Sequence, residues 1–428
     1  MAVKGYPMPP KKPTERMGEG ELKIDYDFND GARIYIHKFA REKQPTFTVI
    51  MRDDARNFVI FAKKGVEAGT MLVSNKKYYI PFVLQVIEEY GKETIWETFI
   101  DFRGRNVMVC FPVGTLGDSI AWMASALRFC RTHEEAKLIT LVLSDTAKTM
   151  FTDLRVKLPS NTTILSMSEY ERDKKDINRK WPPYATYNLG LFTEDDENDT
   201  RPIAYQKTGL IGVADSILGG DPDFSLTTPY PEVSVSVGKV PFKRPYAAIA
   251  VQASAPMKCW LNPNGWIQVV KHLNSLGLDA VCIDREPATG HGPVTVQIPN
   301  GAIDMTGDMP LAERAAVIAR AKMFIGVSSG LAWLAWMVQK NIVLISGFTE
   351  PFNEFPGCAS VMNKMVCHGC WNDTRFKFDV DDPLWCPLHK GTERHLECSR
   401  CISASQVIRA IDNCMAGNPC EKPGLGYW

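Results

Sequence analysis

The sequence lacks an excess of charge of either sign, and it lacks an uninterrupted apolar segment of membrane length. Its 428 residues include 49 Lys+Arg and 49 Asp+Glu, so the formal net charge is zero. Without a basic surplus there is no global field to drive non-specific binding to nucleic acid or to an anionic membrane surface. The longest apolar stretch, 324–347, is interrupted by Ser328, Gln339 and Lys340. We therefore expect a strand, a helix and a second strand there, and no membrane span.

The N-terminus also lacks a secretory signal, because residues 1–20 contain lysines and prolines but no apolar core. We therefore expect a cytoplasmic protein. In that compartment a dense group of cysteines more often binds metal than forms disulfides. Of the 12 cysteines, eight crowd into Cys358–Cys420, which makes this segment the candidate metal site.

Apolar patterning divides the chain into six predicted segments. A flexible arm (1–21) precedes a β-rich module (22–104), whose short alternating apolar runs are typical of antiparallel strands. The segments 105–240 and 241–360 open with continuous apolar runs, VMVCFP at 107–112 and YAAIAVQ at 246–252, which are typical of strands buried on both faces. A cysteine metal finger (361–402) and a C-terminal helix and tail (403–428) follow.

Strands and helices alternate in both middle segments, and this alternation predicts an α/β fold with a doubly wound sheet in each. In the first segment we expect strands at 107–112 and 138–144 and a helix at 118–130. In the second we expect strands at 246–252, 280–284, 323–327 and 341–346, and helices at 265–276, 310–321 and 330–339. Two such Rossmann-like domains would face each other across a cleft, with ligands at the carboxyl ends of the strands.

The turn from Gly114 to Ser119 (GTLGDS) lies between a predicted strand and a predicted helix. Asp118 either caps this helix, by accepting hydrogen bonds from its first N–H groups, or acts as a general base toward an acceptor hydroxyl. We expect the helix N-terminus to lower the pKa of Asp118 and keep it ionised. The turn lacks the G-x-G-x-x-G pattern, so a nicotinamide cofactor is weakly supported.

Three further turns lie at carboxyl ends of strands in the second α/β segment. On the turn 252–260, Lys258 either places a point charge on a diphosphate or is a solvated surface lysine. Asp284 either holds a ribose hydroxyl or caps the next turn. The small residues 326–331 open a helix and could bind an anion at its N-terminus. Trp333 and Trp336 on that helix are more typical of core.

The cysteine-rich segment contains the pair Cys367-His-Gly-Cys370, followed by Cys386 and by Cys398-Ser-Arg-Cys401. Spaced cysteines of this kind indicate a tetrahedral thiolate site for zinc or iron. The candidates exceed four positions: Cys398 and Cys401 compete, and the histidines His368, His389 and His395 are nearby. We interpret the site as structural, because 365–401 has little apolar periodicity of its own.

The chain resembles the bacterial autotransporter heptosyltransferases, relatives of the lipopolysaccharide ADP-heptose transferases, over about 105–401. The resemblance rests on an ordered set of motifs: GTLGDS (114–119), QASAPMKCW (252–260), NPNGW (262–266), CIDRE (282–286), TGDMPLAER (306–314), FIGVSSGLAWLAW (324–336), VLISGFTEPFNEF (343–355) and the cysteine block 367–400. Two residues depart from the expected pattern: Ala332 stands where we expect a serine, and Cys401 is an additional thiol.

This resemblance implies a GT-B fold, transfer of heptose from ADP-heptose to serine hydroxyls of autotransporter passenger repeats in the cytoplasm, and assembly into large ring-shaped homo-oligomers. It implies Asp118 as the catalytic base and Lys258 as the diphosphate lysine. It also implies one structural iron per chain, with zinc as the alternative, held by Cys367, Cys370, Cys386 and Cys398. The predicted substrate-binding residues are Thr115, Leu116, Gly117, Gln252, Ser254, Lys258, Asp284, Ser328, Ser329, Gly330, Leu331 and Glu354.

Two other functions remain open at this point. One is a nucleotide-sugar transferase acting on lipopolysaccharide or another glycan, although the neutral chain shows no basic acceptor patch. The other is a non-enzymatic metal-finger binding module. Its usual partner would be nucleic acid, and only a modest basic patch near Lys390, Arg394 and Arg400 supports that. We therefore expect no nucleic-acid partner.

Overall fold

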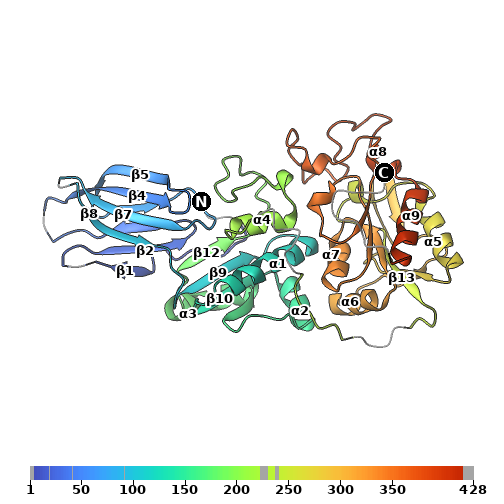
Figure 1. Cartoon of the computed structure of the whole chain (residues 1–428), viewed down its shortest axis with the longest axis horizontal. Helices are drawn as coiled ribbons and strands as arrows, with labels where there is room; N and C mark the ends of the chain where they lie inside the picture. The colour runs from blue at the N-terminus through green and yellow to red at the C-terminus, as the bar shows by residue number, and fades with distance from the viewer. Residues whose placement is uncertain are drawn as a thin grey trace.

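The structure is a computed structural model that describes residues 4–18, 20–40, 42–90, 92–221, 230–236 and 241–417. The elements follow one another along the long axis of the molecule, with the N-terminal strands at one end, an α/β unit in the middle and a second α/β unit at the other end (Figure 1). The predicted tail and Cys420 fall within 418–428, outside the described residues. Among the described residues, no helix is both long and apolar enough to span a bilayer.

The middle unit is built on an eight-stranded sheet. Its parallel strands are β11 (Thr162–Ser166), β10 (Leu138–Leu143), β9 (Asn106–Phe111), β12 (Ala185–Asn188) and β2 (Ile24–Asn29), and the antiparallel strands β3 (Arg33–Ile36), β6 (Met71–Val73) and β1 (Glu15–Met17) extend it. The helices of this unit are α1 (Leu116–Thr132), α2 (Asp145–Asp153), α3 (Met167–Lys180) and α4 (Leu210–Ile217), with a short 3-10 turn η1 (Tyr205–Lys207). The central strand β9 is buried after its first residue, as its continuous apolar run predicts.

Only part of the predicted β-rich segment (22–104) therefore forms a sheet of its own. Part of it, β2, β3 and β6, continues the sheet of the middle unit through hydrogen bonds between β2 and β12. The rest forms a separate antiparallel sheet of β5 (Phe58–Glu67), β4 (Thr46–Asp53), β7 (Phe82–Glu88) and β8 (Thr94–Phe99). Alternation of apolar and polar residues predicts strands but not their partners, which is why the continuity was not visible in the sequence.

The N-terminal residues 4–18 are packed along the middle unit, in contrast to the expected flexible arm. Strand β1 pairs with β2, and the Thr14 N–H donates to Asp27 at 3.2 Å. Arg33 donates to the Pro10 carbonyl at 2.6 Å. Tyr6 is only 8% exposed. A buried tyrosine and backbone pairing outweigh the prolines and lysines that suggested disorder.

The second α/β unit has a six-stranded parallel sheet. Its strands, in spatial order, are β17 (Ile303–Asp304), β14 (Asp279–Cys282), β13 (Tyr246–Ala250), β18 (Phe324–Val327), β19 (Ile342–Ile345) and β20 (Ala359–Val361). Helices α5 (Gly265–Ser275) and α9 (Ala404–Met415) pack together, as do α6 (Leu311–Arg320) and α7 (Gly330–Met337). A hairpin of β15 (Ala288–His291) and β16 (Val294–Gln297) follows β14.

The cysteine-rich segment packs on this second unit and contains the short helices η5 (Cys370–Asn372) and α8 (Glu397–Arg400). Ser399 accepts the Leu261 N–H at 2.9 Å, and Trp260 donates to the Ile402 carbonyl at 3.0 Å. Four aromatic side chains pack against one another: Trp371, Phe378 and Trp385 of the segment, and Phe348, which follows β19. These contacts fix the segment beside the carboxyl ends of β13 and β19.

Candidate functional site

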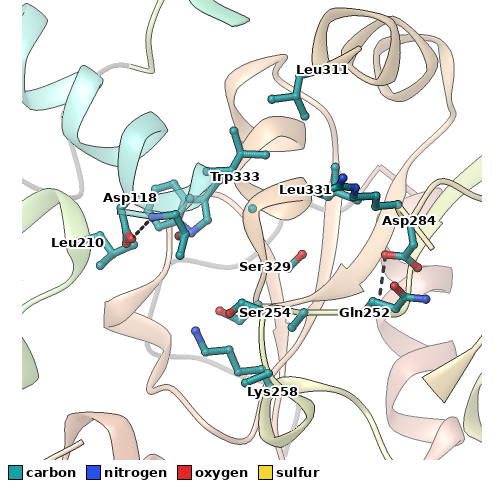
Figure 2. A pocket seen from close by; sticks show the side chains of 18 of the residues that line it. Asp118, Leu210, Gln252, Ser254, Lys258, Asp284, Leu311, Ser329, Leu331 and Trp333 are labelled. Carbon is teal, nitrogen blue, oxygen red and sulfur yellow. Dashed lines mark hydrogen bonds between the residues drawn. The ribbon is translucent and has the colours of Figure 1, made fainter. Parts of the chain in front are cut away.

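A cavity of about 1210 Å³ lies where the carboxyl ends of the parallel strands of the two sheets face each other. Sites for single small ligands typically have roughly 300–1,000 Å³, so this cavity has room for more than one substrate. Its lining includes every residue predicted to be catalytic or substrate-binding: Thr115, Leu116, Gly117, Asp118, Gln252, Ser254, Lys258, Asp284, Ser328, Ser329, Gly330, Leu331 and Glu354. The fold therefore brings these residues together from five different turns (Figure 2).

Asp118 lies in the first turn of α1, and its carboxylate accepts the Thr115 N–H at 2.7 Å. Burial raises the pKa of Asp118, although the Thr115 hydrogen bond and the charge of Lys258 act in the opposite direction. The expectation that the helix N-terminus would lower this pKa was therefore wrong, because desolvation of the carboxylate is the larger effect. A carboxylate with a raised pKa is a stronger base, and it lines the cavity while it also closes the helix turn.

The N-termini of α1 and α7 meet at the centre of the cleft. A Cβ at Gly117 would lie 2.8 Å from the Trp333 ring, and a Cβ at Gly330 would lie 2.8 Å from the Leu116 Cβ. The two glycines thus allow the close approach of two helices from different units. Trp333 lines the cavity here, whereas Trp336 packs against it and Phe355 in the core.

Lys258 is half-buried at the end of η3 (Pro256–Lys258) and lines the cavity, so the alternative of a fully solvated surface lysine is wrong. Its Nζ lies 5.6 Å from the centre of the Phe348 ring and 5.7 Å from that of Trp371. Burial lowers the pKa of Lys258, while the charges of Asp118 and Glu354 raise it. A desolvated ammonium held by aromatic faces is a strong site for an anionic group.

Two polar atoms that line the cavity have no partner among the described residues: Ser329 Oγ and Glu354 Oε2. The other carboxylate oxygen of Glu354 accepts the Ser328 hydroxyl at 2.7 Å and the Thr349 hydroxyl. Burial raises the pKa of Glu354. An unpartnered buried carboxylate oxygen is costly, and at the cavity wall this one is within reach of a ligand.

Asp284 lines the cavity, but the backbone occupies both of its oxygens. The Val251 N–H donates to one at 2.7 Å and the Gln252 N–H to the other at 3.3 Å. Burial raises the pKa of Asp284 to about 6. These bonds connect the ends of β13 and β14, so the observed role of Asp284 is to hold the 251–258 turn. Its contact with a ribose stays a prediction.

Sequence reasoning missed several residues that line the same cavity. Arg314 is buried and donates to the carbonyls of Ile283, Asp284 and Gly307, which fixes the turn after β14. Phe348 and Trp371 form the aromatic floor under Lys258, and Asp145 reaches the cavity from α2. Arg314 is the last residue of the motif TGDMPLAER and lies in a predicted helix, so the sequence did offer a signal for it. The aromatic floor had none, because it joins segments that are far apart in sequence.

A second, much smaller cavity of about 10 Å³ lies inside the cysteine-rich segment. Its lining includes all four predicted ligands, Cys367, Cys370, Cys386 and Cys398, but not Cys401, which is exposed. Cys367 Sγ and Cys370 Sγ are 4.0 Å apart. Sulfurs bound to one tetrahedral metal lie about 3.8 Å apart, and the cavity has room for about one atom-sized guest, so these residues fit a metal ion.

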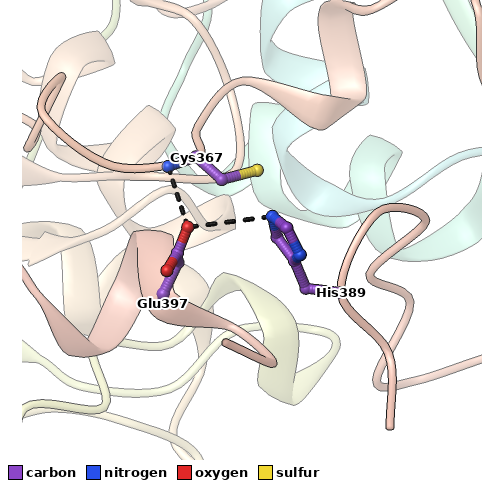
Figure 3. Close-up of side chains that lie close together, drawn as sticks. All are labelled: Cys367, His389 and Glu397. Carbon is purple, nitrogen blue, oxygen red and sulfur yellow. Dashed lines mark hydrogen bonds and ion pairs between the residues drawn. The ribbon is translucent and has the colours of Figure 1, made fainter. Parts of the chain in front are cut away.

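Cys367 also lies beside His389 and Glu397, and one ligand-type atom of each lies within 4.8 Å of the others (Figure 3). Glu397 accepts the Cys367 N–H at 3.1 Å and is paired with Arg394, which lowers the pKa of Glu397 to about 2. Because this carboxylate already has hydrogen-bond partners, it orients the Cys367 backbone. Neither His389 nor Glu397 stood among the predicted ligands.

Comparison with known proteins gives two family matches. Residues 219–376 match glycosyltransferase family 9 (heptosyltransferase), and residues 20–90 match the N-terminal domain of the glycosyltransferase TibC. The chain is 37% identical to the autotransporter heptosyltransferase Aah of Escherichia coli over 403 residues, 94% of this chain and 95% of Aah. It is 36% identical to the autotransporter heptosyltransferase TibC of enterotoxigenic Escherichia coli over 94% of this chain and 92% of TibC.

Solved structures agree with these matches. The crystal structure of TibC, described as an iron-containing dodecameric glycosyltransferase, has a TM-score of 0.83 at 34% identity and covers 96% of this chain and 99% of TibC. A TibC complex with ADP-D-β-D-heptose has a TM-score of 0.81 at 34% identity, covering 96% and 100% of the two chains. The Escherichia coli lipopolysaccharide heptosyltransferase II shares the fold at 13% identity, with a TM-score of 0.50, covering 73% of this chain and 99% of that one.

One relative adds a distinction between family and activity. A Burkholderia thailandensis protein that is 30% identical over 96% of this chain and 89% of its own length is named an inactive autotransporter heptosyltransferase. Activity must therefore be argued from the cavity. The α/β glycosyltransferase fold and the extent of these matches nevertheless establish that the chain belongs to the autotransporter heptosyltransferases, glycosyltransferases of family 9.

Proposed function

We propose that this chain is a GT-B enzyme that transfers heptose from ADP-heptose to serine hydroxyls of an autotransporter passenger protein, in the cytoplasm and with inversion. One observation carries the proposal: a single cavity combines a buried carboxylate, Asp118, with a half-buried ammonium, Lys258. The first has the chemistry of a general base, and the second has that of a diphosphate site.

The donor side of the cavity is formed by the second unit. Lys258 and the N-terminus of α7 at Ser329–Leu331 face the position of the diphosphate, where the ammonium and the helix dipole stabilise the charge of departing ADP. Glu354 Oε2 and Ser329 Oγ, which have no protein partner in the described structure, bind hydroxyls of the sugar. Asp284 holds the turn that carries this site.

The acceptor side is formed by the first unit, where Asp118 projects from α1. The acceptor serine gives its proton to the Asp118 carboxylate as its oxygen bonds to the anomeric carbon. The bond between that carbon and the diphosphate oxygen breaks, and its electron pair leaves with ADP. Attack opposite the leaving group inverts the anomeric configuration.

The cysteine-rich segment is proposed to hold one iron ion, with zinc as the alternative, through Cys367, Cys370, Cys386 and Cys398. The small cavity lined by all four thiols supports this ligand set over one that uses Cys401. A bound metal would cross-link three stretches of chain and so fix Trp371, which follows Cys370 and packs against Lys258. Through this contact the segment also supports the donor site.

We further propose a large ring-like homo-oligomer, because the similar TibC is described as dodecameric. Strand β5 lies at the edge of the four-stranded sheet, and its Phe58 and Val59 are exposed, as is Phe99 on β8. Exposed aromatic residues on an edge strand are typical of an assembly surface. A lipopolysaccharide acceptor and a non-enzymatic module remain weaker alternatives, because neither accounts for the close relationship to Aah and TibC.

Incubation of the purified protein with ADP-heptose and a passenger fragment tests the proposal by intact mass. We expect mass increments of one heptose per modified serine. Parallel reactions with ADP-glucose and with truncated lipopolysaccharide distinguish the donor and acceptor alternatives. Modification of lipopolysaccharide alone, or no transfer to either acceptor, would contradict the proposed function.

A further inference from the structure

The N-terminal segment reaches the base of the catalytic turn. Gly5 has a φ of +87°, and a Cβ there would lie 2.8 Å from Val113, the residue before Gly114. Tyr6 packs in a cluster with Met108 and Cys110 of β9, Val142 of β10 and Tyr170 of α3. The segment thus fills the space behind the turn that carries Asp118.

Tyr6 also holds the loop that follows β12. Its hydroxyl donates to the Leu189 carbonyl at 2.5 Å in a buried position, and its ring lies 6.0 Å from the ring of Phe192. A Cβ at Gly190 would lie 2.7 Å from the Tyr6 hydroxyl, so the loop closes directly over the phenol. Leu191, between these contacts, lines the large cavity.

The 189–192 loop has a second anchor in Arg201. Arg201 donates to the Leu191 carbonyl at 2.8 Å. Lys258, Ser329 and Glu354, in contrast, come from the second unit. Tyr6 therefore contacts two walls of the acceptor side, the Val113–Asp118 turn through its neighbour Gly5 and the 189–192 loop directly.

We infer that Tyr6 is a positioning residue for the acceptor: it fixes the Asp118 turn and the 189–192 loop at the distance that an incoming polypeptide serine requires. The N-terminal segment is then a working part of the acceptor site. The inference rests on the proposed transfer reaction. A side chain that acts through two loops affects acceptor kinetics without affecting donor affinity.

The test compares three full-length variants, Tyr6→Ala, Tyr6→Phe and Met8→Ala, with the wild type. Met8 lies in the same segment but is 63% exposed, so it is the matched control. For Tyr6→Ala we expect kcat/KM for a passenger fragment to fall roughly 10- to 100-fold, because displacement of a reacting group by about 1 Å costs this much. We expect the Kd for ADP-heptose, measured by calorimetry, to stay within about twofold of wild type.

Tyr6→Phe keeps the ring and removes only the bond to Leu189, so its acceptor KM should lie between those of the wild type and Tyr6→Ala. This variant keeps the test decisive if Tyr6→Ala does not fold. Wild-type acceptor kinetics in both Tyr6 variants, or donor affinity that falls together with acceptor kinetics, would overturn the inference. Absence of transfer by the wild type would instead contradict the proposed function, so the two failures are distinguishable.

Discussion

Burial decides the chemistry of the charged residues in the cavity. Asp118 accepts a hydrogen bond in a helix turn, an arrangement that ordinarily lowers a carboxylate pKa, yet desolvation raises it. Lys258 and Glu354 follow the same rule, since burial lowers the pKa of the amine and raises that of the acid. Each shift favours the neutral form of the side chain, so the protonation state of each residue is sensitive to a charge that enters the cavity.

These shifts predict the pH dependence of the reaction. The base must be ionised, so activity is lost as pH falls through the pKa of Asp118, which lies above the ordinary 3.8. The diphosphate site must be protonated, so activity is lost as pH rises through the pKa of Lys258, which lies below the ordinary 10.5. We expect a bell-shaped pH profile of kcat/KM, with its two limbs closer together than the ordinary pKa values of 3.8 and 10.5. An acid limb at the unperturbed aspartate value would contradict the burial argument.

A substitution of Glu354 should affect binding of the sugar part of the donor and not binding of its nucleotide part. In Glu354→Gln, an amide replaces the carboxylate whose Oε2 has no protein partner in the described structure. We expect the Kd for ADP-heptose to rise about tenfold, as for the loss of a hydrogen bond to a charged group, while the Kd for ADP is unchanged. Calorimetric titration with both ligands measures this difference.

The matched control for this variant is Glu350→Gln, four residues earlier and outside the lining of the cavity. Its affinity for both ligands should equal that of the wild type. Equal weakening of ADP and ADP-heptose binding by Glu354→Gln would show that Glu354 has no contact with the sugar.

At the scale of elements, the sequence predicted the second α/β unit closely. The expected strand at 246–252 is β13 (Tyr246–Ala250), and the expected helix at 330–339 is α7 (Gly330–Met337). Continuous apolar runs and small residues at strand ends are local signals. They also placed the site residues, because in a parallel sheet all carboxyl ends meet at one edge.

Contacts between distant elements could not be predicted in the same way. Nothing near Tyr6 indicates that it packs under β9 and β10, and nothing in the finger indicates that Trp371 lies beside Lys258. The pairing of β2 with β12 likewise joins segments about 160 residues apart, which no local pattern encodes. Such contacts follow from tertiary packing alone.

The cysteine-rich segment carries a prediction about its ligands. Cys398→Ser should remove the bound metal and lower the thermal unfolding midpoint, because the four thiols that line the small cavity would no longer close a tetrahedral site. Cys401→Ser is the control, since this exposed thiol lies outside the cavity. Elemental analysis of both purified variants measures the effect. Full metal content in Cys398→Ser would contradict the ligand assignment.

At the scale of the whole molecule, both α/β units line the one cavity. In the proposed reaction the first unit would supply the base and the acceptor wall, and the second would supply the diphosphate and sugar contacts. Gly117 and Gly330 let the two helix ends approach until the halves of the site meet. The N-terminal four-stranded sheet lies at one end of the long axis of the molecule, far from the second unit (Figure 1).

The variant Asp118→Asn tests this division of the reaction between the two units. Transfer to a passenger fragment and binding of ADP-heptose are measured on the same preparation, beside Asp145→Asn, which changes another aspartate that lines the cavity. We predict that Asp118→Asn lowers the transfer rate by about 10²- to 10⁴-fold and leaves the Kd for ADP-heptose unchanged, and that Asp145→Asn retains transfer. Full transfer activity in Asp118→Asn, or loss of donor binding together with transfer, would contradict the account.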